Sequence, residues 1–335
     1  MPTIGIDVHK TESQVAVVAD DDGELLDEVR VQNANLGEFA AEYAGASAVI
    51  EATSNYYAIY DALDEHLEVS VAHPTDLKWI VESSQKTDRA DATKLAELLR
   101  LNGVPESYVP PEEIRECRAL ARGRKKLVEK RSDCKNEVHA LLDQNGIQFE
   151  PSVFSAEGRE RLAALDLEGT DQILLDQWLD MIEAFDERIA ALDRAIERVS
   201  REIPEVDLLL TIPGVSTFSG VLIHGEIGEV DRFDNAKQLV SYAGLDPTVR
   251  ESGDSRTEGS ISKEGSEYLR WILYNCASTA VHNCKDPYLT EFYERKRRQG
   301  KPHKVAMVAT ARKLLVAIFH MLDREEVYDP PEVSD

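Results

Sequence analysis

Cysteine is scarce in this sequence, and long apolar runs are absent from it. The four cysteines never form a C-x-x-C pair, which argues against a zinc site or a redox dithiol. We expect them to be reduced thiols of a soluble cytoplasmic protein. No run of eighteen apolar residues occurs and no segment resembles a signal peptide, so no membrane contact is expected.

Positive charge is also scarce. Asp and Glu number 63 against 38 Lys and Arg, which gives a net charge of −25 and a pI of about 4.7. Such a balance normally argues against a polyanionic partner, because affinity for phosphates comes from Lys and Arg. The acidic residues are spread along the chain, however, and Lys is sparse relative to Arg. We interpret this as adaptation to high salt in a halophilic prokaryote, in which case net charge says little about partners.

Four carboxylates in the first hundred residues form the most informative pattern. Asp7 and Glu51 each follow a short apolar, β-prone run, while Asp88 and Asp91 are spaced to share one face of a helix. Acids from two strand ends and one helix face can converge on two divalent ions, which steady the attacking and leaving oxygens of a phosphodiester. Oxygen-only ligands favour Mg²⁺ or Mn²⁺. We therefore predict that these four residues are catalytic metal ligands.

Each acid also has a simpler interpretation. In so acidic a chain, a single carboxylate is usually solvated surface. Thr87 and Asp88 could cap a helix over 88–101, with Asp91 completing a capping-box-like pattern. The order and spacing of the four acids within one compact α/β region favour the metal site.

The first 105 residues are predicted to form a ribonuclease-H-like α/β domain. Residues 3–19 read as strand, turn and strand, and residues 25–31 read as a third strand. Helices and strands then alternate, at 35–44, 46–50, 56–66, 69–72, after Thr75 and at 88–101. Three meandering strands followed by alternating helix and strand indicate this fold class.

Residues 106–205 are predicted to be a helical linker with a coiled coil. Apolar residues repeat every seven in two slots over 171–203, which is typical of a coiled coil; an ordinary bundle helix is the alternative. They are Leu175, Ile182, Ile189, Ile196 and Ile203, with Trp178, Phe185, Leu192 and Val199 in the second slot. The helix predicted over 112–143 is the most basic stretch of the chain. We expect its Arg122, Lys126 and Arg131 to contact nucleic acid, unless the helix is merely solvated.

Residues 206–325 are predicted to form a mostly α-helical domain. Its first segment, Leu208–Val215, resembles one half of a helix-hairpin-helix, in which the turn at Gly214 presents N–H groups to a phosphate. A polar loop is expected at 249–262, before a long helix over 267–283. A basic segment at 295–304, in which Lys304 is a candidate phosphate contact, precedes a last helix over 304–323.

Motifs in both end domains together resemble one known family. The acids lie in the segments Ile6–Lys10, Ile50–Thr53 and Lys86–Ala92. The C-terminal motifs are Leu209–Val215, Ala243–Pro247, Ser252-Gly253 and Ile261–Arg270. In this combination and order the chain resembles the DEDD-type transposases of insertion sequence 110, which are related to the Piv-type DNA invertases. The resemblance covers nearly the whole chain.

The resemblance implies a RuvC-like N-terminal domain with its four acids and a nucleophilic serine at Ser252, with Ser255 as an alternative. The serine would attack a scissile phosphate and link covalently to DNA, while the metal polarises that phosphate or stabilises the leaving 3′ oxygen. A structured guide RNA would pair with target and donor DNA, so protein contacts, including Lys263 and Arg270, would be mainly to backbone. A dimer or tetramer at the nucleoid is implied. Glu264 departs from the family, which often has a basic residue there.

Two other functions stay open. A structure-specific endonuclease of the Holliday-junction type would explain the four acids but would leave Ser252 without a role. A covalent protein–DNA adduct separates that function from a transposase. An actin-like ATPase or kinase also begins with a strand, an acid and a hairpin, which Asp7 and Thr11 could imitate. That class requires a second glycine-rich phosphate loop, and the sequence over 104–207 contains none.

The acidic composition predicts an unusual dependence on salt. At low salt, repulsion should loosen the fold and oppose the approach of a polyanion. Above about 1 M salt the screening length falls to about 3 Å, so local cationic contacts act without opposition from distant acids. We expect folding and activity to need molar KCl and to pass through an optimum, measured by circular dichroism and DNA cleavage. A stable, active protein at about 0.1 M salt would show that the acidity has another cause.

Overall fold

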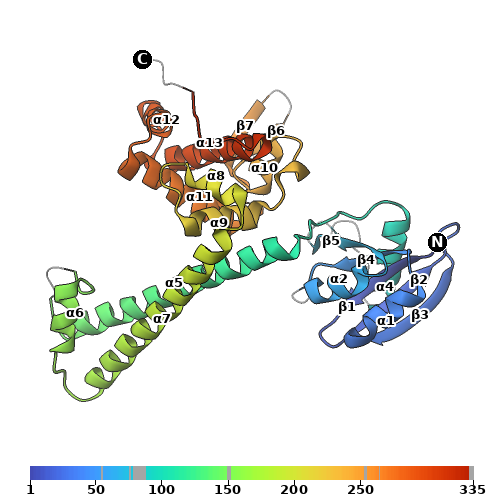
Figure 1. The fold of residues 1–335 in the computed structure, drawn as a ribbon, viewed down its shortest axis with the longest axis horizontal. Coiled ribbons are helices and arrows are strands. Elements are labelled where there is room, and N and C mark those ends of the chain that lie inside the picture. Colours follow the sequence, from blue (N-terminus) through green and yellow to red (C-terminus); the bar gives the residue numbers. More distant parts are fainter. Residues whose placement is uncertain are drawn as a thin grey trace. The chain divides into compact units, whose positions relative to one another are not determined.

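The computed structural model describes residues 1–53, 56–74, 77, 88–148, 152–252, 255–263 and 265–331. The side chains of residues 88–89, 248–252 and 255–260 lie outside that description. The chain divides into two compact units, residues 1–109 and 110–335 (Figure 1). Three domains are predicted from the sequence; the structure groups the second and third of them in one unit.

The N-terminal unit is built on a five-stranded mixed sheet in the order β3-β2-β1-β4-β5. Its strands are β1 (Thr3–Val8), β2 (Glu12–Val18), β3 (Leu25–Gln32), β4 (Ser47–Glu51) and β5 (Glu68–Ala72). The first three form an antiparallel meander, and β4 and β5 extend the sheet parallel to β1. The predicted meander followed by alternating helices and strands is confirmed.

Side-chain alternation along β1 separates the two faces of this sheet. Ile4, Ile6 and Val8 belong to a core cluster that includes residues of α1 (Leu36–Glu42) and α2 (Tyr56–Asp64). On the opposite face, Gly5 and Val49 lie against α4 (Asp88–Arg100). The sheet is therefore covered on both sides. Asp7, two residues after Gly5, lies on the α4 face.

The N-terminal unit extends four residues beyond the predicted boundary at 105. The Ser107 N–H donates a hydrogen bond to the Val71 carbonyl at 2.7 Å, and Glu106 forms a β-bridge with Ala72. Val109 packs against the core of the sheet. These contacts add a short pairing to the edge of β5, which composition alone does not reveal. Most of the helix expected after Thr75 lies outside the described residues.

Two long helices dominate the first part of the second unit. They are α5 (Glu112–Gln144) and α7 (Thr170–Ser200), with the short α6 (Ala156–Ala163) between them. The ion pairs Arg124–Asp193 and Arg131–Asp186 show that the two helices run antiparallel, as a helical hairpin within one chain (Figure 1). The helix predicted over 112–143 is confirmed, and the segment predicted over 171–203 is helical as far as Ser200.

The heptad residues of α7 form the seam of this helical hairpin. Its first-slot residues are buried: Leu175, Ile182, Ile189 and Ile196. The repeat was predicted to continue to Ile203. That part of the prediction is wrong, because α7 ends at Ser200 and Pro204 begins the next helix. The structure shows intramolecular packing of α5 on α7; association with a second chain through this seam stays a prediction.

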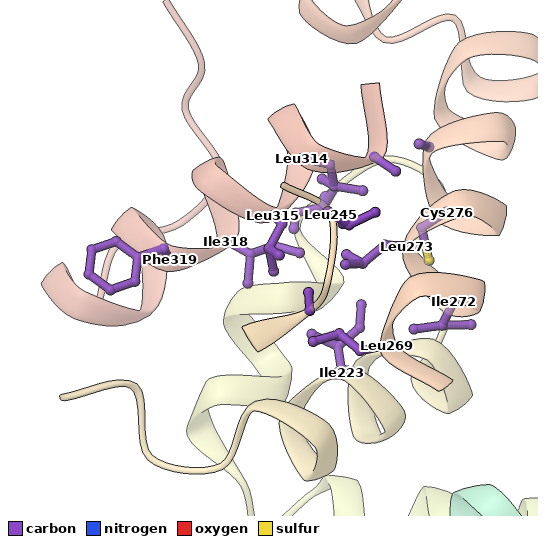
Figure 2. Close-up of a cluster of buried hydrophobic side chains, with 14 of the residues drawn as sticks. Ile223, Leu245, Leu269, Ile272, Leu273, Cys276, Leu314, Leu315, Ile318 and Phe319 are labelled. Atoms are coloured by element: carbon purple, nitrogen blue, oxygen red, sulfur yellow. The ribbon is translucent and has the colours of Figure 1, made fainter. Parts of the chain in front are cut away.

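The rest of the second unit is mostly helical. Its helices are α8 (Pro204–Leu210), α9 (Thr217–Ile227), α10 (Ala236–Tyr242), α11 (Glu267–Thr279), α12 (Pro287–Arg298) and α13 (His303–Arg324), with a π-helical turn at Ala280–Cys284. Leu314, Leu315 and Ile318 of α13 point into a core shared with Leu269 and Leu273 of α11 (Figure 2). Although α13 is long and apolar enough to cross a membrane, more than half of its apolar window is buried in this core.

A β-hairpin replaces the polar loop expected at 249–262. Strand β6 (Pro247–Ser252) pairs antiparallel with β7 (Ser255–Ile261). The prediction of a loop was wrong because this stretch lacks the alternation of apolar and polar residues that identifies strands. Its one usable signal is Gly253-Asp254, a dipeptide typical of two-residue hairpin turns.

The seam of the helical hairpin predicts that two isoleucines of α7 contribute unequally to the free energy of unfolding. Ile189 is 5% exposed, whereas Ile173 on the same helix is 63% exposed. Ile189→Ala should lower the free energy of unfolding by about 2–5 kcal/mol, because it leaves a cavity between two helices. Ile173→Ala should change it by less than about 0.5 kcal/mol. Urea denaturation followed by circular dichroism measures both, and equal effects would contradict the observed seam.

Candidate active site

Asp7 and Glu51 lie at the carboxyl ends of neighbouring parallel strands of the N-terminal sheet. Ile6 of β1 is in register with Ile50 of β4, so the following residues, Asp7 and Glu51, lie next to each other at the carboxyl edge. Both side chains are on the α4 face, since their predecessors point into the opposite core. The Asp7 side chain is 18% exposed, and its Oδ2 lies 3.5 Å from Nε2 of His9.

Gly5 sets the distance between β1 and α4. A Cβ built on Gly5 would lie 2.0 Å from the Ala92 carbonyl oxygen and 2.4 Å from the Ala96 nitrogen. Only a residue without a side chain allows this contact, because both neighbours are backbone atoms of a helix. The glycine thus brings the helix backbone directly onto the strand that carries Asp7.

The direction of α4 follows from a second glycine. A Cβ on Gly23, in the turn between β2 and β3, would lie 2.4 Å from Oε1 of Glu97 near the end of α4. That turn adjoins the start of β1, because Thr3 pairs with Val18. Helix α4 therefore runs antiparallel to β1. Its first turn, which contains Asp88 and Asp91, lies toward the edge where Asp7 and Glu51 end.

The structure describes three of the four predicted ligands in full. The Asp91 side chain is 32% exposed and lies 3.5 Å from Nζ of Lys94. The backbone of Asp88 begins α4, but its side chain is outside the described part. Among the described residues, no group of three or more His, Cys, Asp or Glu is close enough to hold a metal ion. Oxygen donors at one sheet edge fit Mg²⁺ or Mn²⁺, and convergence of all four on a metal stays a prediction.

Ser252 and Ser255 lie opposite each other at the end of the β6–β7 hairpin. They form the last residue pair of its register, so the two candidate nucleophiles are cross-strand neighbours. Their side chains, like those of most of this hairpin, are outside the described residues. The backbone thus places both serines next to the turn that joins the two strands.

The two ends of this hairpin are fixed by hydrogen bonds. The Ser262 hydroxyl donates to Oδ1 of Asp246 at 2.7 Å, and the Ser262 N–H donates to the Asp246 carbonyl at 2.9 Å. Arg270 donates from Nη1 to the carbonyls of Ala243 and Gly265, at 3.0 and 3.1 Å. Arg270 thus supports the base of the hairpin. Lys263, close by, is exposed and has a left-handed backbone with φ of 60°. Contact of either residue with nucleic acid stays a prediction.

The basic residues of α5 are largely engaged within the unit. Nε of Arg122 lies 2.6 Å from Oε1 of Glu226, and Arg131 pairs with Asp186 of α7. Burial alone would raise the pKa of Asp186, but hydrogen bonds from Arg131 and Arg159 hold it below its ordinary value. Lys126 is exposed. A nucleic-acid role for Arg122 and Arg131 stays a prediction, and it competes with these ion pairs.

Gly214 has a packing role that the sequence did not indicate. Its φ of 94° is in the left-handed region, and a Cβ there would lie 2.8 Å from the Ala280 nitrogen and 3.0 Å from the Cys276 carbonyl oxygen. The turn between α8 and α9 therefore rests directly on the end of α11. This contact accounts for the glycine without a phosphate, and its predicted nucleic-acid contact stays untested.

A basic surface with aromatic rings lies on α12 and α13. The last turn of α12 carries four basic residues, Arg295, Lys296, Arg297 and Arg298. The guanidinium of Arg295 lies 5.3 Å from the ring centre of Phe292, and Nζ of Lys313 lies 4.5 Å from that of Tyr288. Lys304, at the start of α13, is exposed. Cations interleaved with aromatic faces suit the backbone and bases of a nucleic acid.

An acidic cavity of about 1020 Å³ lies between the start of α5, the start of α8 and the end of α13. Eight carboxylates line it: Glu113, Glu116, Glu202, Glu205, Glu229, Asp231, Asp323 and Glu325. Burial lowers the pKa of His224 at its wall and raises that of Cys117 to about 11. Because both groups are neutral near pH 7, they do not offset the carboxylates. This surface repels polyanions, which leaves the α12–α13 surface as the better candidate for nucleic acid.

Two family models match the chain over the regions that carry these features. A transposase model of the DEDD type for insertion sequence 110 matches residues 4–146, which include the acidic sheet edge and α4. A model described as transposase IS116/IS110/IS902 family matches residues 206–294, which include the Ser252 hairpin. The chain belongs to the IS110 family of transposases. It is an enzyme that acts on DNA, as a transposase or recombinase.

Relatives extend this match through both units. A probable family 20 transposase of Pseudomonas aeruginosa is 26% identical over 98% of each chain. The transposase for insertion sequence element IS1111A of Coxiella burnetii is 24% identical, over 97% of this chain and 90% of its own. The pilin gene-inverting protein of Moraxella bovis is 29% identical, over 84% of this chain and 81% of its own. These matches to two transposases and a pilin gene-inverting protein therefore span both units of the chain.

The contact at Gly5 predicts that one methyl group displaces α4. Gly5→Ala should lower the free energy of unfolding by about 1–3 kcal/mol. We expect a value near the upper end of this range, because the neighbouring atoms belong to the backbone of α4 and cannot move aside as a flexible side chain could. Amide hydrogen exchange in α4 should accelerate. Gly37→Ala is the matched control, since a Cβ there meets only Ala62 O at 3.5 Å. A Gly5→Ala protein with unchanged exchange in α4 would contradict the close approach.

Proposed function

We propose that this transposase cuts and exchanges DNA strands with Ser252 as nucleophile and a divalent metal at the acidic edge. The observation that supports this most directly is the placement of Asp7 and Glu51 side by side, with the first turn of α4 directed at the same edge. Neighbouring strand ends and a helix terminus are elements that hold acidic side chains in fixed positions.

Asp7, Glu51, Asp88 and Asp91 are the proposed ligands of Mg²⁺ or Mn²⁺. When bound, such an ion stabilises negative charge on a scissile phosphate. The carboxylates of this chain orient the ion and offset its charge. The DEDD type of the matched family model supports these ligands, which the sequence pattern also indicated.

In the proposed strand transfer, Oγ of Ser252 attacks the phosphorus of a DNA phosphodiester. The new Oγ–P bond replaces the P–O bond to the leaving strand, whose 3′ oxygen takes up a proton as the serine hydroxyl loses one. A 3′ hydroxyl of a second strand then attacks the serine ester, which restores Ser252 and joins the strands. The number of phosphate ester bonds is the same before and after, so no external energy source is required. Both candidate serines lie at the hairpin tip.

We propose DNA, a structured guide RNA and further copies of the chain as partners. Sequence choice would lie in base pairing to the RNA, with protein contacts mainly to backbone. Lys126, Lys263, Lys304 and the basic last turn of α12 are the proposed contacts, and most of these residues are exposed. A dimer or tetramer that assembles through the helical hairpin as a coiled coil, in the cytoplasm at the nucleoid, completes the proposal.

Neutral replacements test the proposed metal ligands. Asp7→Asn and Glu51→Gln should each abolish strand exchange, because a neutral amide does not balance the charge of the ion. Both proteins should remain folded, since these side chains lie at a partly exposed edge. Glu68→Gln, at the exposed first residue of β5, is the control and should keep its activity. Recombination assays with Mg²⁺, alongside circular dichroism, provide the measurement; normal exchange by Asp7→Asn or Glu51→Gln would refute the assignment.

The two hairpin serines provide a matched pair for the nucleophile. Ser252→Ala should eliminate the covalent protein–DNA adduct but preserve nucleic-acid binding, while Ser255→Ala should leave the adduct in place. Trapping the adduct and mapping the modified peptide by mass spectrometry distinguishes them. An adduct at Ser255 would reassign the nucleophile. No adduct with the unaltered protein, together with metal-dependent cleavage, would favour the structure-specific endonuclease instead.

A further inference from the structure

Glu226 is a fully buried carboxylate in the middle of the second unit. It lies on α9 with an exposed fraction of 0%. Nε of Arg122 donates to its Oε1 at 2.6 Å and Nη2 donates to its Oε2 at 2.8 Å, a two-pronged ion pair. The hydroxyl of Ser266 donates a third hydrogen bond to Oε2 at 2.7 Å. A buried charge persists only with such complete partners.

Three separate elements meet at this residue. Arg122 belongs to α5, and Ser266 is the N-cap of α11, where its Oγ also accepts from the Leu269 N–H at 3.1 Å. The Tyr242 hydroxyl, at the end of α10, donates to the Glu226 carbonyl at 3.2 Å. One turn before Arg122, Arg118 donates to the carbonyls of Gly225 and Glu226. The helical hairpin is thereby joined to α9, α10 and α11 through one acid and its own backbone.

These contacts hold both ends of the Ser252 hairpin. Tyr242 precedes β6 by a few residues, and Ser266 follows β7 by a few residues. Gly265, with φ of 92°, lies so close to Tyr242 that a Cβ would come within 1.9 Å of its carbonyl oxygen. The chain segments that enter and leave the hairpin are therefore in direct contact, and both are tied to the Glu226 network.

We propose that Glu226 and Arg122 are positioning residues, which fix the β6–β7 hairpin, and with it Ser252, relative to the α5–α7 helices. The proposal rests on Ser252 as the nucleophile. In this proposal the guanidinium of Arg122 forms an ion pair with Glu226 and does not bind a phosphate. The guanidinium lies 4.7 Å from the ring centre of Tyr268 on α11, which further constrains its plane.

A reciprocal pair of variants provides the diagnostic pattern. Glu226→Gln leaves Arg122 with an unbalanced charge, and Arg122→Gln leaves a buried carboxylate without its cation. The double variant removes both charges and leaves neutral amides able to hydrogen bond. If the pair acts as a unit, each single variant is impaired and the double variant recovers. Asp193→Asn is the matched control, because it breaks the Arg124–Asp193 ion pair, which joins α5 to α7 and not to the segments that flank the β6–β7 hairpin.

Hydrogen exchange of backbone amides in residues 242–266 measures the positioning without catalysis. We expect about tenfold faster exchange in each single variant, exchange within about threefold of the unaltered protein in the double variant, and no change in Asp193→Asn. The rate of adduct formation at Ser252 should fall in both single variants and recover in the double variant. Unchanged exchange in both single variants would overturn the proposal.

Nucleic-acid affinity separates positioning from direct contact. A phosphate ligand at Arg122 predicts that Arg122→Gln weakens binding and reduces the salt slope by about 1, whereas Glu226→Gln does neither. Positioning predicts that both variants bind within about twofold of the unaltered protein. Weaker binding by Arg122→Gln alone would therefore refute the inference.

Ser266 provides a milder test in case a single charge variant does not fold. Ser266→Ala removes one hydrogen bond from Glu226 and should accelerate exchange over 242–266, while Ser266→Thr retains the hydroxyl and should restore it. Exchange that is the same in both Ser266 variants and in the unaltered protein would count against positioning. Failure of Ser252 itself is recognised separately: the unaltered protein would then form no adduct at Ser252, yet the exchange pattern would remain.

Discussion

The shortage of positive charge is the constraint on which the second unit depends. Carboxylates outnumber cations along the chain, so an arginine that pairs with an acid inside the unit leaves fewer cations for a phosphate. On α5, Arg122, Arg124 and Arg131 pair with acids of α9 and α7. Cations used in this way join helices and are then poor ligands for nucleic acid. The last turn of α12, none of whose residues lines the acidic cavity, instead carries a cluster of four basic residues.

Sequence periodicity predicted the helices and strands in which regularly spaced residues form a buried face. The strands of the N-terminal sheet and the seam of α7 follow from alternation and heptads, because one face of each is buried. The β6–β7 hairpin has few apolar residues, so periodicity gave no signal there. The heptad also overran α7 to Ile203, since the local effect of Pro204 outweighs an apolar repeat.

The residues of the candidate site also differ in whether the sequence alone could identify them. Asp7 and Glu51 were recognisable because each follows a short apolar run, and the register of β1 and β4 then places them together. The contribution of Gly5 was not recognisable, since it depends on Ala92, far along the chain. Glu226 and its partner Arg122 are likewise distant in sequence, and one carboxylate among 63 acidic residues carries no distinguishing pattern. Long-range packing, not composition, determines what these residues do.

The α5–α7 hairpin has a mechanical consequence. Helix rises by 1.5 Å per residue, so about 33 Å of α5 separates Arg122 from its far end at Gln144. A tilt of about 5° at the Arg122 root would displace that far end by about 3 Å, roughly two residues of helical rise. A load applied at the distal end of this helical hairpin thus acts with leverage on the contacts near Arg122, which include the buried ion pair with Glu226.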